Sequence, residues 1–545
     1  MTGFADLSGE LVEQIFVACL SGPPNVNQRQ LERLQMVSMS FSAVARRLLF
    51  ANITVETSDR GARLLEVLTK DLALARYVRT IVVQSEAFLL PSIFSDLAQD
   101  DLLRLTSSAQ SFDSPYVSFA PLKDGRKPLP AYPSTLRSIR LGAPVEYESD
   151  SQSDASDEED EVQAASAAAI KAQQNYLTLL TSLPNSVQSL KMSALPDNLL
   201  LSVPPSQSFP LTHLTSLLLD FVNISPAFLD WLGSTSNGFK RVQMWCLKGV
   251  TSFDILRFMQ RNGGQLEEVL FKPKGNKQGP NLGNEIVLYC TSLKRLTLGD
   301  KACNHEIYPL LPSSLEHLCV SLPMYHSDYS LLPISTEIKD RLDSLVCLEL
   351  YSQIYFPPTI HSRYPPKQEG DTTTSSLREL RLSHIAAVPG DISQFLDTLG
   401  ENLYTLALHH ISEHPSTLLA GCPFLRRLEV GVSHSLNPSE SSFFDALSAP
   451  FLHYLRVHFN SSISLSDLIS ALPVLSQNGL KTLELTGFFP DDLGGAGWKS
   501  GKNVDKLVQG CKEGGVELVV NGRGVESFGE LWVGLLAGHG STFLV

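Results

Sequence analysis

The chain has 545 residues, of which 43% are hydrophobic and 18% are charged, as in a globular protein long enough for roughly two to four domains. Its 43 Lys and Arg residues against 57 Asp and Glu residues give a formal net charge of −14, which argues against a general nucleic-acid binder. No apolar run approaches the roughly 18 residues of a membrane helix, and the start MTGFADLSGE lacks the basic and apolar parts of a signal peptide. We therefore expect neither a membrane-spanning protein nor a secreted one.

The eight cysteines form no C-x-x-C pair, so neither a zinc knuckle nor a thioredoxin-like redox site is indicated. Several of them lie in apolar runs, which favours buried free thiols in a reducing compartment. We therefore expect a cytoplasmic protein, a nuclear protein, or one found in both places.

Residues 1–55 are predicted to form three helices and a short strand. Apolar residues recur at helical spacing in Leu7–Leu20, Gln28–Met36 carries two leucines, and Ser40–Phe50 is a third helix. Asn52–Val55 is strand-like and follows directly. Three helices of this length make too small a core alone, so a partner or the next domain must complete it.

An ordered set of residues runs through this segment: Leu7, Glu10, Leu11, Val12, Ile15, Phe16, Leu31, Leu34, Val37, Ser38 and Phe41. In these residues the segment resembles an F-box of the fungal type, whose pattern is Leu-Pro-x-Glu-Leu-Leu-x-x-Ile-Phe, a leucine-bearing helix, and then Val-Ser/Cys-x-x-Phe. Ser8 stands where the family has Pro. The resemblance implies docking on a Skp-family adaptor, and through it on a cullin–RING ubiquitin ligase complex. The alternative interpretation is that the same apolar stripe forms the core of a larger helical domain. The implied adaptor-binding residues are Leu7, Leu11, Ile15, Phe16, Leu31, Leu34, Val37 and Phe41.

Residues 56–142 are interpreted as a linker with the first irregular repeats. Two apolar triplets, at Val78-Ile81-Val83 and Leu136-Ile139-Leu141, indicate strands, whereas residues 107–132 are rich in Ser and Pro and predict a loop. Residues 143–163 form an acidic tract that we expect to be disordered. Nine acids and no Lys or Arg lie between positions 146 and 161, so removing these nine charges from −14 leaves −5 for the rest of the chain.

From residue 164 to 523 one apolar triplet recurs, with its members at positions i, i+3 and i+5. The last two members are two residues apart and therefore point to one face of a short strand. Helical stretches such as Ser252–Gly263, with a capping Ser and a terminal Gly, and Leu465–Leu472 lie between the triplets. Twelve copies follow one another at intervals of 22 to 32 residues, and they begin at positions 187, 214, 239, 266, 293, 315, 345, 377, 403, 425, 452 and 480.

The periodic region resembles the leucine-rich repeats. The predicted fold is therefore α/β: a short three-helix F-box followed by an irregular repeat solenoid with a parallel sheet. The Asn or Cys that the family places after each strand is mostly absent, as Lys301 and Ile411 show, so we expect irregular repeats. Pro pairs and a Thr/Ser run predict a loop insertion over 355–376, and residues 524–545 are interpreted as a C-terminal cap.

Between the apolar positions, other side chains are expected to line the opposite face of the sheet. Its middle row places Glu429 beside Arg456 and Arg456 beside Glu484. Two interpretations stay open together, lateral ion pairs that support the sheet and a surface for an unknown protein target. The candidate target-binding residues are Arg241, Trp245, Arg295, Tyr351, Arg381, Arg427, Tyr454 and Arg456.

One motif could indicate an enzyme. His410, Glu413 and His414 match an H-x-x-E-H zinc peptidase pattern, but that chemistry needs a helix, and here the motif directly follows a predicted strand. We find no assignable catalytic set, metal site or cofactor site, and the chain is not expected to be an enzyme.

The favoured hypothesis is a substrate-recognition subunit of a Skp-cullin-F-box ubiquitin ligase that binds its target through the repeats. The alternative is a leucine-rich-repeat scaffold or inhibitor without a role in ubiquitin transfer, and a zinc hydrolase ranks last.

Overall fold

The fold is taken from a computed structural model. The residues that it describes are 13, 31, 39–55, 58–83, 102–103, 105–118, 132–145, 173–174, 176–193, 195, 200–202, 211–234, 238–273, 281–299, 302–321, 344–354, 376–385, 396, 400–411, 419, 421–432, 451–458, 465–486, 502–520 and 523–524.

The chain divides into two compact units, which are described separately. The N-terminal unit is Met1–Leu266 with Pro273–Gln278, and the C-terminal unit is Glu267–Lys272 with Gly279–Val545.

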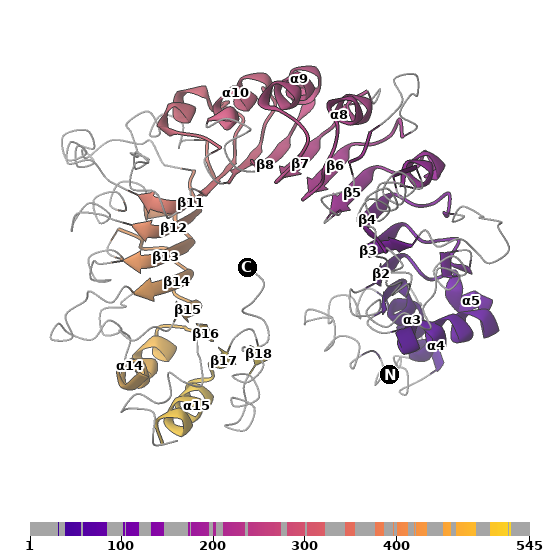
Figure 1. Ribbon diagram of the computed structural model, residues 1–545. Helices are drawn as coiled ribbons and strands as arrows, with labels where there is room; N and C mark the ends of the chain where they lie inside the picture. The colour runs from indigo at the N-terminus through magenta and orange to yellow at the C-terminus, as the bar shows by residue number, and fades with distance from the viewer. Residues whose placement is uncertain are drawn as a thin grey trace, which may run out of the picture. The chain divides into compact units, whose positions relative to one another are not determined.

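The N-terminal unit begins with helices and continues as a parallel sheet with helices on one side (Figure 1). Strands β1 to β7 pair in chain order, each parallel to the next. Its elements are α3 (Met39–Ala51), β1 (Asn52–Val55), α4 (Ser58–Lys70), α5 (Leu72–Ala75), β2 (Thr80–Val83), β3 (Ser111–Ser118), β4 (Ser138–Val145), β5 (Ser189–Ser193), β6 (Ser216–Asp220), α8 (Pro226–Leu232), β7 (Arg241–Trp245), α9 (Ser252–Asn262) and η3 (Gly263–Gln265).

The C-terminal unit has the same repeat architecture. Strands β8 to β17 are parallel in chain order, and β18 adds to β17 in the antiparallel direction. Its elements are β8 (Glu268–Lys272), α10 (Leu282–Tyr289), β9 (Arg295–Leu298), η5 (His305–Leu310), β10 (His317–Ser321), β11 (Cys347–Ile354), β12 (Glu379–Ile385), η7 (Gly400–Asn402), β13 (Thr405–Ile411), β14 (Arg427–Val432), β15 (Tyr454–His458), α14 (Leu465–Gln477), β16 (Thr482–Thr486), α15 (Lys502–Gly514), β17 (Glu517–Val520) and β18 (Arg523–Gly524).

The predicted α/β repeat fold with a parallel sheet is confirmed. Every one of the twelve triplets supplies a strand, and all three of its apolar members are buried, as Leu377, Leu380 and Leu382 illustrate with no exposed surface. The last two members of each triplet point to one face of the sheet, which the connections between the strands cover, and burial therefore alternates along a strand such as β6. The expected irregularity is also present, since the register shifts after Tyr351 in β11 and after His409 in β13.

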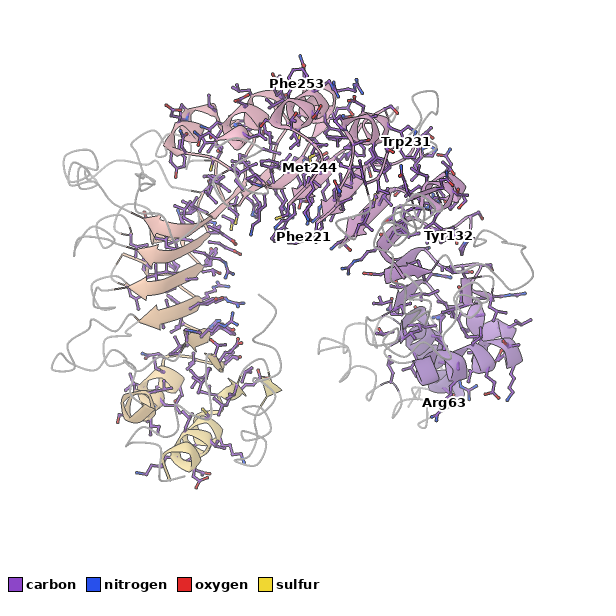
Figure 2. All side chains as sticks on the ribbon, in the orientation of Figure 1. Arg63, Tyr132, Phe221, Trp231, Met244 and Phe253 are labelled. Atoms are coloured by element: carbon purple, nitrogen blue, oxygen red, sulfur yellow. The ribbon has the colours of Figure 1, made fainter. Side chains whose placement is uncertain are left out.

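Helices α8 and α9 illustrate how the inner face is covered. Figure 2 shows Met244 between β7 and these helices, Phe253 on the outer surface of α9, and Phe221 on the side of the strands away from the helices. Helix α9 occurs where the sequence predicts it, but its cap is Thr251 and not Ser252. The Thr251 hydroxyl accepts from the backbone N–H of Asp254, whose carboxylate accepts from the backbone N–H of Thr251 at 2.9 Å, which forms a capping box.

The expected loop over residues 107–132 is wrong in part, because β3 occupies Ser111–Ser118 between β2 and β4. Its triplet is reduced to Ala109, Phe112 and Ser114, of which Ala109 and Phe112 are buried. A small residue at the first position and a polar one at the last hide the apolar pattern, while pairing with both neighbouring strands maintains the extended conformation.

Other predicted segments lie largely outside the described residues. They are the acidic tract apart from its first three residues, which belong to β4, the insertion 355–376 apart from Ser376, and the C-terminal cap apart from Gly524. Among the helices that the structure does describe, none has the length and apolar character needed to span a membrane.

Candidate functional site

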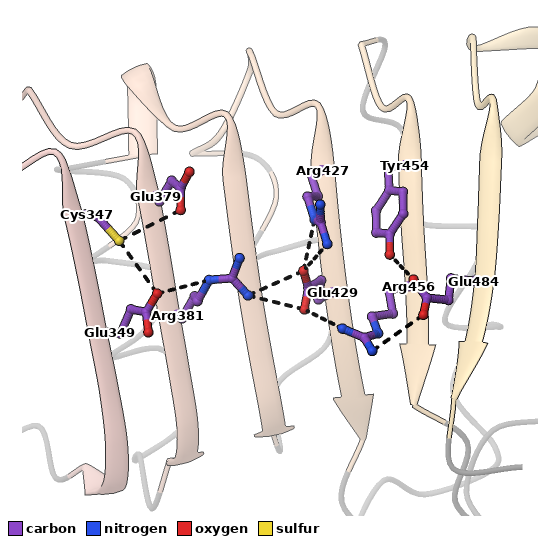
Figure 3. A network of polar contacts seen from close by, with 9 residues as sticks. All are labelled: Cys347, Glu349, Glu379, Arg381, Arg427, Glu429, Tyr454, Arg456 and Glu484. Atoms are coloured by element: carbon purple, nitrogen blue, oxygen red, sulfur yellow. Dashed lines mark hydrogen bonds and ion pairs between the residues drawn. The ribbon is translucent and has the colours of Figure 1, made fainter. Parts of the chain in front are cut away.

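The polar side of strands β11 to β16 carries a connected set of charged side chains, which we call the Glu429 network (Figure 3). The parallel register places side chains from successive strands at the same level, so the middle row is fixed by backbone pairing. The members are Cys347, Glu349, Glu379, Arg381, Arg427, Glu429, Tyr454, Arg456 and Glu484.

Glu429 on β14 is the centre of this network, and only 2% of its side chain is exposed. Arg427 of the same strand donates through Nε to Glu429 Oε1 at 2.9 Å. Arg456 on β15 places Nη1 at 3.6 Å from Oε2, and Arg381 on β12 donates through Nη1 to both carboxylate oxygens at 3.4 Å. A single buried carboxylate therefore joins three guanidinium groups.

The contact between Arg381 and Glu429 spans two strand intervals, or about 10 Å of sheet. The residue between them in the row is Ala407 of β13, which is fully buried. Because Ala407 has only a methyl group, the long Arg381 side chain can pass over β13 to reach β14.

At both ends of the network the chain of contacts continues to further glutamates. Arg381 Nε lies 3.4 Å from Glu349 Oε1 on β11, and Arg456 Nη2 lies 3.5 Å from Glu484 Oε1 on β16. Tyr454 donates its hydroxyl to Glu484, and the Arg427 guanidinium stacks 4.1 Å from the centre of the Tyr454 ring. The arginines are thus held in place on both sides by acids and by an aromatic ring.

The electrostatics keep Glu429 ionised and Tyr454 neutral. Burial raises the pKa of Glu429, but Arg381, Arg427 and Arg456 together outweigh it, so that pKa lies below its ordinary value. Burial and the nearby Glu484 carboxylate raise the pKa of Tyr454 to about 12. The phenol therefore acts as a hydrogen-bond donor at neutral pH.

Cys347 lies at the first strand of the network and is not an activated nucleophile. Its thiol is 3.7 Å from Glu349 Oε1 and 3.8 Å from Glu379 Oε2. Burial, reinforced by these two carboxylates, raises the pKa of the Cys347 thiol to about 12, which keeps the sulfur protonated and unreactive.

The predicted neighbours Glu429–Arg456 and Arg456–Glu484 are confirmed as ion pairs. Of the candidate target-binding residues, four meet in the Glu429 network: Arg381, Arg427, Tyr454 and Arg456. Arg241 and Trp245 lie on β7 of the N-terminal unit, and Arg295 lies on β9, two strands before β11. Tyr351 belongs to β11, but its side chain is outside the described part.

Sequence reasoning identified the middle row but missed the cross-strand roles of Ala407 and Tyr454. Two features of the sequence carry this information: the small residue Ala407 at one position of the row, and Tyr454, which lies two residues before the row position of its own strand.

Most of the implied adaptor-binding residues lie outside the described part of the chain: Leu7, Leu11, Ile15, Phe16, Leu34 and Val37. Leu31 is described and is 6% exposed, and Phe41 belongs to α3, although its side chain is not described. The predicted third helix and the strand Asn52–Val55 are confirmed as α3 and β1.

The zinc-peptidase motif is only partly described. His410 belongs to strand β13 and not to a helix, and Glu413 and His414 lie outside the described residues. In the described ranges, no group of three or more His, Cys, Asp or Glu side chains is arranged to hold a metal ion.

No protein-family model matches the chain, and no curated protein matches it. Among solved structures, Rad7 in the yeast Rad7–Elc1 complex is 16% identical, covering 58% of this chain and 73% of that chain with a TM-score of 0.33. The TLR13–ssRNA13 complex is 14% identical, covering 76% of this chain and 64% of that chain with a TM-score of 0.34. At these identities and TM-scores neither protein assigns a partner to this chain.

Proposed function

We propose that the chain is a substrate-recognition subunit of a Skp-cullin-F-box ubiquitin ligase. The N-terminal helices dock on a Skp-family adaptor that links to the cullin, and the repeats hold a protein target. Ubiquitin transfer belongs to other subunits, so the chain itself catalyses nothing.

The observation that best supports this proposal is the direct continuation of the F-box-like segment into the sheet. Helix α3 ends at Ala51, β1 starts at the next residue, and β1 pairs with β2 over four residues from Asn52↔Thr80 to Val55↔Val83. Because β2 is the first triplet strand, the adaptor-docking segment and the repeats share one hydrogen-bonded ladder.

Side chains reinforce this connection within the N-terminal unit. Helix α3 packs against β1 and α5. Arg47 of α3 pairs with Glu13, which lies inside the first predicted helix, and Val44 and Ala45 of α3 are buried. A rigid link of this kind suits a receptor, because a target lysine must be presented at a reproducible place relative to the transfer enzyme.

Replacing two apolar residues of the docking stripe should abolish adaptor recovery. The variant Leu11→Asp with Ile15→Asp puts two charges on an apolar contact face, where uncompensated burial of each is strongly unfavourable. The measurement is co-purification of the adaptor and the cullin with the tagged full chain from cells.

The matched control is Leu288→Asp with Val474→Asp, since both side chains are exposed on helices of the C-terminal unit. This control should recover the adaptor as the unmodified chain does. Equal recovery by the docking variant and the unmodified chain would contradict the docking proposal. Recovery of the adaptor without the cullin would instead favour the scaffold or inhibitor.

A further inference from the structure

One edge of the C-terminal sheet carries a row of cationic and aromatic side chains that the Glu429 network does not include. The row consists of the residues just before strands β12 to β16. Each residue after the first donates its backbone N–H to the carbonyl of the preceding member at 2.8 to 3.0 Å, so the row is continuous along the sheet. Its members, which we call the strand-start row, are Arg378, Tyr404, Arg426, His453 and Lys481.

The first three members are organised before any ligand binds. The guanidinium carbons of Arg378 and Arg426 lie 5.2 and 5.1 Å from the centre of the Tyr404 ring, so both cations stack on one phenol. Arg378 also donates through Nη1 to the carbonyl of Asn402 at 3.1 Å. Stacking fixes the guanidinium planes and leaves N–H groups at their edges, which lowers the entropy lost on binding.

The charge of this row is available, in contrast to the charge of the Glu429 network. There, three arginines face glutamates at 2.9 to 3.6 Å. In the strand-start row, Arg426, His453 and Lys481 are exposed, and no described carboxylate forms an ion pair with any of the three. The row contains two arginines, a lysine and no acidic member. One carboxylate, Glu401, lies in the segment that leads to β13, so the row keeps an excess of positive charge.

Two exposed aromatic side chains lie beside the cations. Phe424 and Phe451, each two residues before a member of the row, are both 49% exposed. Their rings stack with centroids 6.2 Å apart and an interplanar angle of 28°. Exposed, adjacent aromatic rings beside arginines are typical of anchor positions at protein interfaces.

We propose that the strand-start row binds an acidic segment of the protein target, with carboxylates on Arg378, Arg426 and Lys481 and an apolar side chain on Phe424 and Phe451. This assignment rests on the proposed function and names the chemistry of the target that the repeats recognise. It places recognition at the strand-start edge, because the arginines of the Glu429 network already bind acids of the chain itself.

The spacing of the cations sets the spacing of the carboxylates. Arg378, Arg426 and Lys481 are separated by two strands each, which is about 10 Å on the sheet. A peptide in the polyproline II conformation advances about 3.1 Å per residue and returns to the same face every third residue, so acidic residues three apart in the target match the row.

The test uses the intact chain and a fluorescein-labelled peptide, Gly-Ser-Glu-Gly-Leu-Glu-Gly-Leu-Glu-Ser-Gly, followed by fluorescence anisotropy. Arg426→Gln with Lys481→Gln should weaken binding about tenfold or more, since two charge-assisted contacts are lost. Arg261→Gln with Lys512→Gln removes the same charge from exposed sites on α9 and α15 and should leave the affinity unchanged.

A second peptide of the same composition with its three glutamates adjacent should bind at least several-fold more weakly. The proposal is overturned if the unmodified chain binds neither peptide, if both double variants lose affinity equally, or if the two peptides bind alike. It is also overturned if only a peptide with phosphoserines in place of the glutamates binds. Displacement of the labelled peptide by single-stranded RNA at equal concentration would overturn it as well. None of these results affects adaptor co-purification, so failure here and failure of the proposed function are separable.

Discussion

Glu429 shows how a single residue organises the surface of the C-terminal unit. Removing a carboxylate from water costs several kcal/mol, and that cost is offset only when cations and hydrogen-bond donors surround it. Glu429 has Arg427, Arg456 and Arg381 within 3.6 Å, and its pKa stays below the ordinary value in spite of burial. The same contacts hold the three arginines in one arrangement over β12, β14 and β15, so its charge supports both stability and surface shape.

Replacing Glu429 by Gln should destabilise the C-terminal unit by about 2 kcal/mol at neutral pH. The loss is smaller than the roughly 3–5 kcal/mol expected for a fully buried pair, because solvent screens arginines that are 25% to 41% exposed. Urea unfolding followed by circular dichroism measures it. Glu517→Gln, at an exposed position on β17, should change the free energy of unfolding by less than about 0.5 kcal/mol. Equal effects of both substitutions would contradict a central role for Glu429.

The stability difference between the unmodified chain and the Glu429→Gln variant should depend on pH, and the direction of this dependence follows from the pKa of Glu429. The pKa of Glu429 in the fold lies below its ordinary value of 4.5, so the folded state binds this proton less tightly than the unfolded state does. The stability contributed by the ionised group is complete above that value and disappears as the pH falls through the folded pKa. The difference between the unmodified chain and Glu429→Gln should therefore be constant above about pH 5.5 and narrow below pH 4.5.

Part of this network follows from the sequence alone. The triplet spacing fixes which residues of neighbouring strands share a row, and that is sufficient to pair Glu429 with Arg456 and Arg456 with Glu484. The contact of Arg381 across Ala407 is not a nearest-neighbour contact, so it depends on side-chain length and on the small residue between. Stacking of Arg378 and Arg426 on Tyr404 depends on side-chain conformation in the same way, and the spacing of the apolar triplets does not predict side-chain conformation.

At the scale of elements, the strands were predictable and several termini were not. Strands with a full apolar triplet are recognisable because the two triplet members within the strand are two residues apart and face the core together. Strand β3 lacks that signal, since Phe112 is the one large apolar member of its triplet, and pairing on both sides specifies it instead. The cap of α9 was misplaced by one residue because Thr251 and Ser252 are adjacent hydroxyl residues with similar capping preference.

Substitutions at these two hydroxyls should separate them. Thr251→Ala removes the hydroxyl that accepts from the Asp254 backbone N–H and should lower the free energy of unfolding of the N-terminal unit by about 1 kcal/mol. Ser252→Ala should cost less than half as much, because Ser252 is inside the helix and Ala favours that position. Thermal unfolding of the two variants provides the comparison. A larger loss from Ser252→Ala would mean that the helix begins one residue later.

At the scale of the whole molecule, the net charge of −14 is concentrated in one place. Nine of the acids lie between residues 146 and 161, and the rest of the chain carries the remaining −5. In the Glu429 network of the C-terminal unit, acids and bases lie beside one another. Net charge therefore says little about partner choice, which depends on local rows of residues. Ser156, followed by five acids, resembles a site for an acid-directed kinase, and phosphate would add about −1.5 to −2 charges there.

Deleting residues 146–161 should leave the Tm of the chain nearly unchanged. The tract has no apolar triplet and no basic residue, so it offers a repeat neither core side chains nor internal ion pairs. Strand β4 ends at Val145 and pairs with β3 and β5 through residues before the deletion, so the ladder does not require the tract. Differential scanning calorimetry measures the change, with deletion of residues 111–118, which removes β3, as the disruptive comparison. A drop of several degrees for the tract deletion would show that these acids pack against the repeats, and their charge would then have to be counted with the folded surface.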